Sequence, residues 1–166
     1  MIREIDQNVL FDILNYDKNT GVFTWNGDHG HKAKDGNIAG GLSGVGYITI
    51  SLKYKRFLAH RLAWIYENGY IPDNLSIDHI NGIGTDNRLC NLRLATPAQN
   101  GQNIRDSKVT SKTGVLGVSI RKGRNKKYEA SVVFSGKKYA KMFNDIIEAE
   151  NWYLNKKREL HEFCTI

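Results

Sequence analysis

Hydrophobic and polar residues follow one another in patterns that divide the first part of the chain into short elements. Val9–Leu14 has the spacing of a short helix, and β-branched and aromatic residues predict a strand at Val22–Trp25. A hairpin is expected from Tyr47–Leu52 and Lys55–Leu58. Apolar residues at helical spacing then predict a helix over Leu58–Asn68, which ends before a glycine.

Two more strands, separated by a polar loop, are predicted between residues 75 and 95. Leu75–Ile77 has the character of a strand, and Asn81–Arg88 is polar throughout most of its length. Leu89–Ala95 again has apolar residues at the spacing of an extended segment. The pair Asp78-His79 is therefore expected at the end of the first of these strands.

Capping residues mark the start of the next helix. Thr96 is a favoured N-cap, Pro97 suits the first helical position, and Gln99 completes a capping box. The segment is thus predicted to run strand, loop, strand, helix, with Asn100 in the first turn of the helix.

The last part of the chain is predicted to form three strands and a helix. The strands are Val115–Arg121, Tyr128–Phe134 and Lys137–Phe143, joined by glycine-containing turns, and Asp145 can cap the helix. Strand alternation assigns the mostly apolar even positions to the face that packs on the helix, although Lys138 breaks the pattern. The odd positions expected to face outward are Ser119, Arg121, Ser131, Lys137, Tyr139 and Lys141.

These patterns predict an α+β protein with two modules. The first module comprises residues 1–104, and a polar segment, residues 105–113, is expected to link it to the second. Residues 114–166 are predicted to form a three-stranded antiparallel sheet packed on one helix.

The net charge of +7 comes entirely from the second half of this arrangement. Residues 1–104 contain 10 Lys+Arg and 10 Asp+Glu, whereas residues 105–166 contain 14 and 7. Within residues 105–141 the counts are 11 and 2. So local an excess favours a nucleic-acid partner over the alternative, which is a solvated basic surface.

Several classes of protein are disfavoured by composition. No apolar run approaches the ~18 residues of a membrane span, and the N-terminus lacks a signal-peptide pattern, so we expect an intracellular, soluble protein. Cys90 and Cys164 are the only cysteines, which argues against a disulfide framework and a zinc knuckle. Nothing in the sequence indicates an obligate protein partner.

Four polar residues of the central segment suit metal-assisted phosphodiester hydrolysis. Asp78 and the amide oxygen of Asn100 could hold a divalent ion, with water and phosphate completing its coordination. His79 could take a proton from water, and Asn91 could fix the loop through backbone groups. Each residue also has an ordinary alternative. An Asp before a His is common, Asn91 could be a turn residue, and Asn100 could be an exposed helix residue.

The run DHINGIGTDNRLCNLRLATPAQNGQN resembles the HNH motif of phage and intron-encoded homing endonucleases, in the variant that ends in Asn. The stretches YDKNTGVFTW, GYITISL and FLAHRLAWIYENG resemble the same family. This resemblance implies a ββα-metal fold in which His79 is the general base, Asp78 and Asn100 bind the metal, and Asn91 is structural. The terminal Asn suits Mg²⁺, or alternatively Mn²⁺, better than zinc. For His60, packing or DNA contact is favoured over catalysis.

The sequence from residue 114 to about residue 160 resembles the Apetala or ethylene-response-factor DNA-binding domain of plants, on the run GVSIRKGRNKKYEASVVFSGKKYAKMFNDIIEAENWY. That resemblance implies that the sheet binds double-stranded DNA. Ser119, Ser131 and Val133 stand where plant members have charged base readers, so their target sequence does not transfer. The residues expected to contact DNA are Ser119, Arg121, Arg124, Lys126, Lys127, Ser131, Lys137, Tyr139 and Lys141.

The predicted function is a metal-dependent DNA endonuclease, encoded by a phage and of the homing type, acting in the host bacterial cytoplasm. Two alternatives remain open at the level of sequence. One is a DNA-binding regulator with an inert nuclease fold, and the other is an RNA-binding protein, which is disfavoured because no exposed RNP-like aromatic pair is evident.

Overall fold

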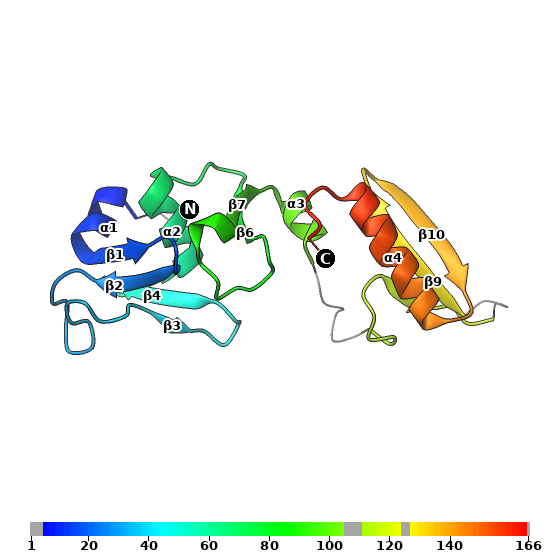
Figure 1. Ribbon diagram of the computed structural model, residues 1–166, viewed down its shortest axis with the longest axis horizontal. Helices are drawn as coiled ribbons and strands as arrows, with labels where there is room; N and C mark the ends of the chain where they lie inside the picture. The colour runs from blue at the N-terminus through cyan, green and yellow to red at the C-terminus, as the bar shows by residue number, and fades with distance from the viewer. Residues whose placement is uncertain (1–4, 105–110, 124–126, 166) are drawn as a thin grey trace. The chain divides into compact units, whose positions relative to one another are not determined.

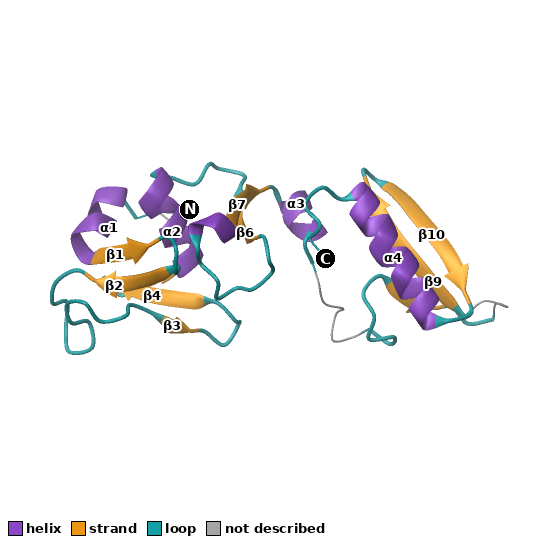
Figure 2. Ribbon diagram, viewed as in Figure 1, coloured by secondary structure: helices purple, strands orange, loops and turns teal. Residues whose placement is uncertain are grey.

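The computed structural model describes residues 5–104, 111–123 and 127–165, and the chain divides into two compact units, Met1–Pro97 and Ala98–Ile166. Each unit has a hydrophobic core of its own and contains both short strands and helices (Figures 1 and 2). The division falls at the start of α3 (Pro97–Gln102), so most of that helix belongs to the second unit. Residues 105–110 of the predicted linker lie outside the described residues.

The first half of the first unit contains a short helix and two small antiparallel sheets. The carboxylate of Asp6 accepts a hydrogen bond from the Asn8 N–H and caps the first helix. The two sheets have the strand orders β1-β2 and β3-β4-β5. The elements are α1 (Gln7–Ile13), β1 (Leu14–Asp17), β2 (Val22–Trp25), β3 (Gly41–Leu42), β4 (Ile48–Leu52) and β5 (Lys55–Leu58).

The second half of this unit is a helix followed by the hairpin that carries Asp78 and His79. The helix α2 (Ala59–Asn68) packs on β4, β5 and β6, and Gly69 ends it with a positive φ of 86°. The hairpin consists of β6 (Ser76–His79) and β7 (Leu92–Ala95), with a single 3₁₀ turn, η1 (Leu89–Asn91), immediately before β7. The order β6, β7, α3 reproduces the predicted strand, strand, helix sequence.

The core of the first unit anchors this hairpin. Leu10, Leu14, Ile50 and Leu62 are fully buried, and they come from α1, β1, β4 and α2. Each such side chain stabilises the fold by about 1.5–3 kcal/mol. Ile77 of β6 and Leu92 of β7 belong to the same core, so the apolar residues beside Asp78 and Asn91 fix the position of the hairpin.

The second unit is a three-stranded antiparallel sheet with one helix packed on it. The strand order is β10-β9-β8, from β8 (Val118–Ile120), β9 (Tyr128–Phe134) and β10 (Lys137–Phe143), and α4 (Ile146–Leu160) contacts all three. The Asp145 carboxylate accepts hydrogen bonds from the N–H groups of Ile147 and Glu148, as its predicted capping role requires. The predicted α+β fold class is confirmed in both units.

The strand predicted over Val115–Arg121 is shorter than expected. Gly117 has a positive φ of 70°, and a Cβ at this position would lie 2.0 Å from the ring of Tyr153. The Thr113 hydroxyl also donates to the Val118 carbonyl at 2.8 Å, which folds residues 113–117 into a turn. The sheet therefore begins at Val118.

The predicted faces of β10 are wrong. Ser135 and Gly136 both have positive φ and form a two-residue turn, so Phe134 pairs with Lys137. Paired residues share a face, and even positions of β9 are therefore matched by odd positions of β10, such as Val132 by Tyr139. Lys137, Tyr139 and Lys141 lie on the helix-facing side of the sheet rather than on the outward side.

Lys138, which broke the predicted alternation, belongs to the outward side. It pairs with the exposed Val133, and Ser131 and Glu129 pair with Ala140 and Met142 on the same face.

Within the described residues, no helix combines the length and the apolar character needed to cross a membrane.

Candidate functional site

The β6–β7 hairpin places Asp78 and His79 next to each other at the end of β6. In the antiparallel register Asp78 faces Arg93 and His79 faces Leu92. Each of the two residues is only 6% exposed. The backbone N–H of Ile80 donates to the Asn91 carbonyl at 2.8 Å, which extends the pairing beyond β6 and brings Asn91 to the same end of the hairpin.

Arg93 holds the carboxylate of Asp78. The Arg93 Nε donates to Asp78 Oδ2 at 2.9 Å, and Nη2 lies 2.9 Å from the same oxygen. Charge-assisted bonds of this kind satisfy a carboxylate that is otherwise removed from water. A carboxylate has about four lone-pair sites on two oxygens, so one ion pair does not exhaust its capacity as an acceptor or a metal ligand.

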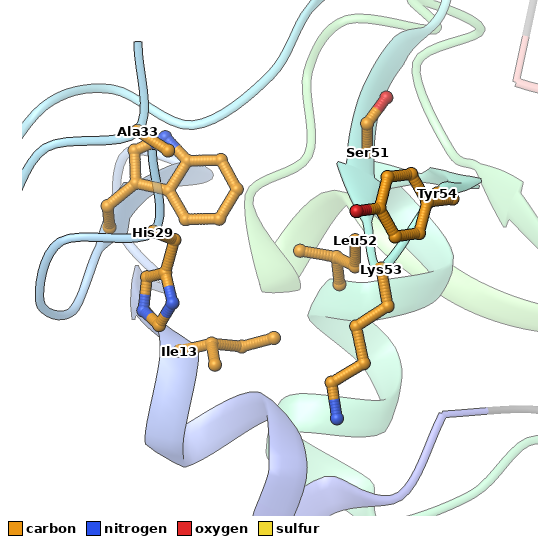
Figure 3. Close-up of a pocket in the computed structure, with 8 residues that line it drawn as sticks. Ile13, His29, Ala33, Ser51, Leu52, Lys53 and Tyr54 are labelled. Carbon is orange, nitrogen blue, oxygen red and sulfur yellow. The ribbon is translucent and has the colours of Figure 1, made fainter. Parts of the chain in front are cut away.

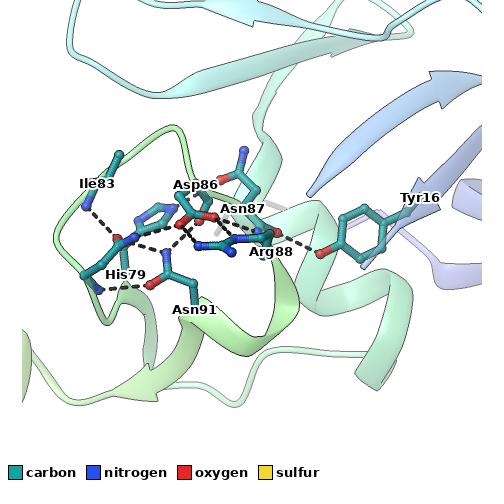
Figure 4. Close-up of polar contacts among 8 residues, drawn as sticks. Tyr16, His79, Ile83, Asp86, Asn87, Arg88 and Asn91 are labelled. Carbon is teal, nitrogen blue, oxygen red and sulfur yellow. Dashed lines mark hydrogen bonds and ion pairs between the residues drawn. The ribbon is translucent and has the colours of Figure 1, made fainter. Parts of the chain in front are cut away.

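His79 is oriented by a buried asparagine (Figure 4). Its Nε2 lies 3.1 Å from Oδ1 of Asn87, which is 2% exposed. Because an amide oxygen only accepts, this contact places a proton on Nε2 of the imidazole. Asn87 is itself fixed through its backbone, since the Tyr16 hydroxyl donates to the Asn87 carbonyl at 2.7 Å. In the neutral form of the ring, this tautomer leaves the lone pair on Nδ1.

Asn91 spans the loop between the two strands (Figure 4). Its Oδ1 accepts from the Asn81 N–H at 2.9 Å. Its Nδ2 donates to Oδ1 of Asn81 at 3.0 Å and to the Asp86 carbonyl at 2.8 Å. One 6% exposed amide thus links three groups of the loop after His79.

Asp86 adds an ionised carboxylate to the same loop. Arg88 donates to it through Nε at 2.8 Å and through Nη2 at 2.7 Å, and Asn81 Nδ2 donates at 2.7 Å. The Arg88 hydrogen bond is the main reason that the pKa of Asp86 falls to about 2. The loop therefore keeps a stable ion pair on its rim, with Arg88 largely exposed.

Two aromatic side chains lie against His79. The His60 ring is 4.8 Å from the His79 ring at an interplanar angle of 79°, and the Tyr47 ring is 5.9 Å from it. Tyr47 and His60 also contact each other, at 5.3 Å between centroids. Burial is the main cause that lowers the pKa of His60 to about 3, followed by the proximity of His79 and Arg61.

Asn100 lies on α3 in the second unit and is exposed. The predicted site residues that the structure brings together are therefore Asp78, His79 and Asn91, and the inclusion of Asn100 remains a prediction. Among the described residues, no three His, Cys, Asp or Glu side chains gather into a cluster that could hold a metal ion. A carboxylate combined with an amide oxygen nevertheless suits a hard ion that retains several waters.

The residues predicted to contact DNA are distributed over the second unit. Ser119, Arg121, Lys127, Lys137 and Lys141 are exposed, and Ser131 and Tyr139 are half-buried. Arg121 donates to Glu129 at 2.9 and 3.0 Å, and Lys138 is paired with the same carboxylate. Arg124 and Lys126 lie outside the described residues.

Asn87, Arg93 and Tyr47 contact the candidate site and were missed by sequence reasoning, whereas His60 was expected to pack or to contact DNA. Asn87 stands in a polar loop, where an asparagine is most often a turn residue. Arg93 could have been found, because a basic residue directly opposite Asp78 follows from pairing the two predicted strands. Tyr47 comes from a distant part of the sequence and gives no local signal of its contact with His79.

A separate cavity in the first unit shares no lining residue with this site. It has a volume of about 440 Å³ and is lined by aromatic and apolar side chains together with Lys53 (Figure 3). Its lining residues are Ile13, Trp25, His29, Ala33, Ser51, Leu52, Lys53 and Tyr54.

Comparison with known proteins identifies relatives of this chain. Residues 57–102 match the family model described as HNH endonuclease. The chain is 35% identical to Protein 3.8 of Escherichia phage T7 over 108 residues, which cover 65% of this chain and 88% of that protein. A solved structure concerned with DNA binding and cleavage by the HNH homing endonuclease I-HmuI is similar at a TM-score of 0.48 and 20% identity, over 84% of this chain and 77% of the other. The chain belongs to the family of phage T7 Protein 3.8, and its central segment is an HNH endonuclease domain.

Proposed function

We propose that this protein is a metal-dependent endonuclease that hydrolyses phosphodiester bonds in double-stranded DNA. The observation that carries the proposal is the contact between His79 Nε2 and Asn87 Oδ1 at 3.1 Å. It favours the tautomer with the lone pair on Nδ1, directly beside a residue with a buried carboxylate. A general base and an acidic ligand at adjacent positions are what hydrolysis of a phosphodiester requires.

In this proposal His79 takes the proton from the attacking water at Nδ1. The bond to Asn87 keeps the ring from adopting the other tautomer, and the bonds of Asn91 hold the loop that follows His79. Proton transfer by a positioned side chain of this kind contributes about 10²–10⁴-fold to the rate.

Asp78 and Asn100 are the residues that would hold the divalent ion, for which Mg²⁺ is the first candidate and Mn²⁺ the second. When bound, such an ion stabilises the charge that develops on the phosphate and on the leaving oxygen. Arg93 has a preparatory role, because its two contacts with Asp78 Oδ2 fix the carboxylate before DNA binds.

We assign DNA positioning mainly to the second unit, by the resemblance to the Apetala-type domain and by charge. Residues 105–141 contain 11 basic and 2 acidic residues, and such a local excess favours contact with phosphates. The corrected register selects Arg121 and Lys138 as the cations of the outward face, where both pair with Glu129.

The relationship to a phage protein supports a phage origin and action inside the host cell. A homing role is the more specific part of the proposal and rests on the resemblance of the HNH motif. A chain that has lost catalysis and acts as a DNA-binding regulator would show binding without cutting.

The experiment is a plasmid assay that separates these functions. Supercoiled DNA is incubated with wild type, His79→Ala and Asn100→Ala in Mg²⁺, in Mn²⁺ and in EDTA, and binding is measured in parallel. We expect metal-dependent nicking by wild type, and DNA binding without nicking by His79→Ala. Binding by wild type with no nicking in either metal would favour the regulator.

A further inference from the structure

The His79 ring is held on more than one side. Asn87 fixes it at Nε2, and the ring of His60 lies against it in an edge-to-face arrangement, with 4.8 Å between centroids. Tyr47 contacts both imidazoles, at 5.3 and 5.9 Å, so the three rings form a mutual cluster. Aromatic pairs at such distances and angles stabilise a defined ring orientation.

His60 occupies a buried position that does not suit a polar ring. It is 7% exposed in the first turn of α2, and its Nδ1 is buried without a hydrogen-bond partner among the described residues. A buried polar atom left without a partner costs stability, and an apolar residue at this position would avoid that cost. Burial is the main cause that lowers the pKa of His60 to about 3, so a cationic ring is disfavoured at this position.

The cluster is closely packed from its other side as well. Gly84, in the loop after His79, lies so near Tyr47 that an added Cβ would come within 2.9 Å of its ring and 2.7 Å of the Gly46 carbonyl. The loop that contains the site therefore packs directly on the tyrosine that contacts His60 and His79. This packing leaves the His79 ring little freedom to rotate.

We infer that His60 is a positioning residue, whose neutral ring, together with Tyr47, holds the His79 imidazole in the orientation in which it receives a proton from water. This inference rests on the proposed function and revises the expectation that His60 packs or contacts DNA. A neutral neighbour suits the task, because a cationic ring at 4.8 Å would oppose the charge that His79 acquires.

Three substitutions of His60 distinguish ring positioning from simple filling of space. His60→Ala removes the ring, His60→Leu retains apolar bulk without a ring, and His60→Phe retains a ring without the unpartnered nitrogen. Two controls are His29→Ala, an exposed histidine whose ring contacts Trp25, and Ile65→Ala, which empties a buried position on the same helix.

The measurements are the kcat and KM of plasmid nicking, DNA affinity in EDTA, and the melting temperature of each variant. We expect His60→Ala and His60→Leu to lower kcat about 10- to 100-fold, with KM and affinity within about twofold of wild type. His60→Phe should recover most of the kcat and melt at or above the wild-type temperature. His29→Ala should match wild type, and Ile65→Ala should lose stability with little change in the kcat of its folded fraction.

Several outcomes would overturn the inference. A wild-type kcat in His60→Ala would show that the ring is not needed, and a folded His60→Phe as slow as His60→Ala would show that a ring at this position does not by itself position His79. A loss of DNA affinity equal to the loss of kcat would make His60 a DNA contact instead. If the wild-type protein itself does not nick DNA, the proposed function fails, whereas a nicking wild type with an equally active His60→Ala refutes this inference alone.

Discussion

Asn87 determines which nitrogen of His79 would act as the base in the proposed mechanism. Its amide oxygen accepts from Nε2, while its backbone carbonyl is bound separately by Tyr16. A change of the side chain should therefore disturb the imidazole without releasing the backbone of the loop. A substitution of Asn87 can therefore test the orientation of His79 without unfolding the loop.

Replacing Asn87 with Ala should slow nicking about 10- to 100-fold, because the imidazole is no longer held in one tautomer and orientation. DNA affinity should remain at the wild-type level, since Asn87 is only 2% exposed. Single-turnover nicking and a binding titration check the two parts, with Asn15→Ala, on an exposed position of β1, as the control. An undiminished nicking rate would show that Asn87 does not orient the base.

Asn91 should matter first for stability. Asn91→Ala removes three hydrogen bonds from the loop after His79. Because partners of these bonds lose their contacts in a partly buried loop, we expect the free energy of unfolding to fall by about 1–3 kcal/mol. Urea unfolding of wild type and variant measures this difference, and an unchanged midpoint would contradict the structural role assigned to Asn91.

At the scale of residues, the sequence predicted Asp78 and His79 at a strand end because local apolar spacing determines where β6 lies. It could not predict Asn87, since a buried hydrogen-bonding Asn and a turn Asn look alike in a polar loop. The contacts of His60 and Tyr47 with His79 were not predicted for a different reason. Their contact with His79 depends on how α2 and the start of β4 pack against the β6–β7 hairpin, which local patterns do not encode.

At the scale of elements, the sheet of the second unit shows how one turn controls the chemistry of a face. A two-residue turn at Ser135-Gly136 pairs positions 134 and 137, so the faces of β10 follow the opposite parity from those of β9. The prediction placed even positions of both β9 and β10 on the helix-facing side. That is correct for β9 and wrong for β10, where the odd positions face the helix. The basic residue that broke the predicted pattern, Lys138, was the signal of the true register.

The register makes a prediction about DNA binding. Removing the two outward cations in Arg121→Ala/Lys138→Ala should weaken DNA affinity more than removing Lys137 and Lys141, which lie on the helix-facing side. Both double variants lose the same formal charge, so the second is a matched control for the first. Fluorescence anisotropy with duplex DNA measures the difference, and equal losses would mean that total charge rather than the outward face governs binding.

The ion pairs of Glu129 with Arg121 and Lys138 should make the stability of the sheet sensitive to acid. The Arg121 hydrogen bond, followed by that of Lys138, lowers the pKa of Glu129 from 4.5 to about 2. A group with a lowered folded-state pKa contributes its stability above the unfolded value and loses it as pH falls through the folded value. Wild-type stability should therefore decline between pH 4.5 and pH 2 more steeply than that of Glu129→Gln. Thermal melts over this range check the difference, and parallel curves would contradict it.

At the scale of the whole molecule, the proposed general base and most of the DNA binding are assigned to different units. The first unit supplies Asp78, His79 and Asn91 from residues that carry no net charge excess, and the second supplies the basic segment. Affinity that depends on phosphate contacts falls steeply with salt. The logarithm of the DNA association constant should thus fall linearly with the logarithm of salt concentration, with a smaller slope in Arg121→Ala/Lys138→Ala than in His79→Ala. Identical slopes would argue against this division.

The central claim is that His79 is the general base of a metal-dependent DNA endonuclease. Its most direct test is the nicking of supercoiled plasmid in Mg²⁺ by wild type and His79→Ala at matched, saturating protein concentrations. We predict that the wild-type protein nicks, that EDTA abolishes the reaction, and that His79→Ala is slower by about 10²–10⁴-fold while it still binds DNA. Nicking by His79→Ala at the wild-type rate would contradict the account.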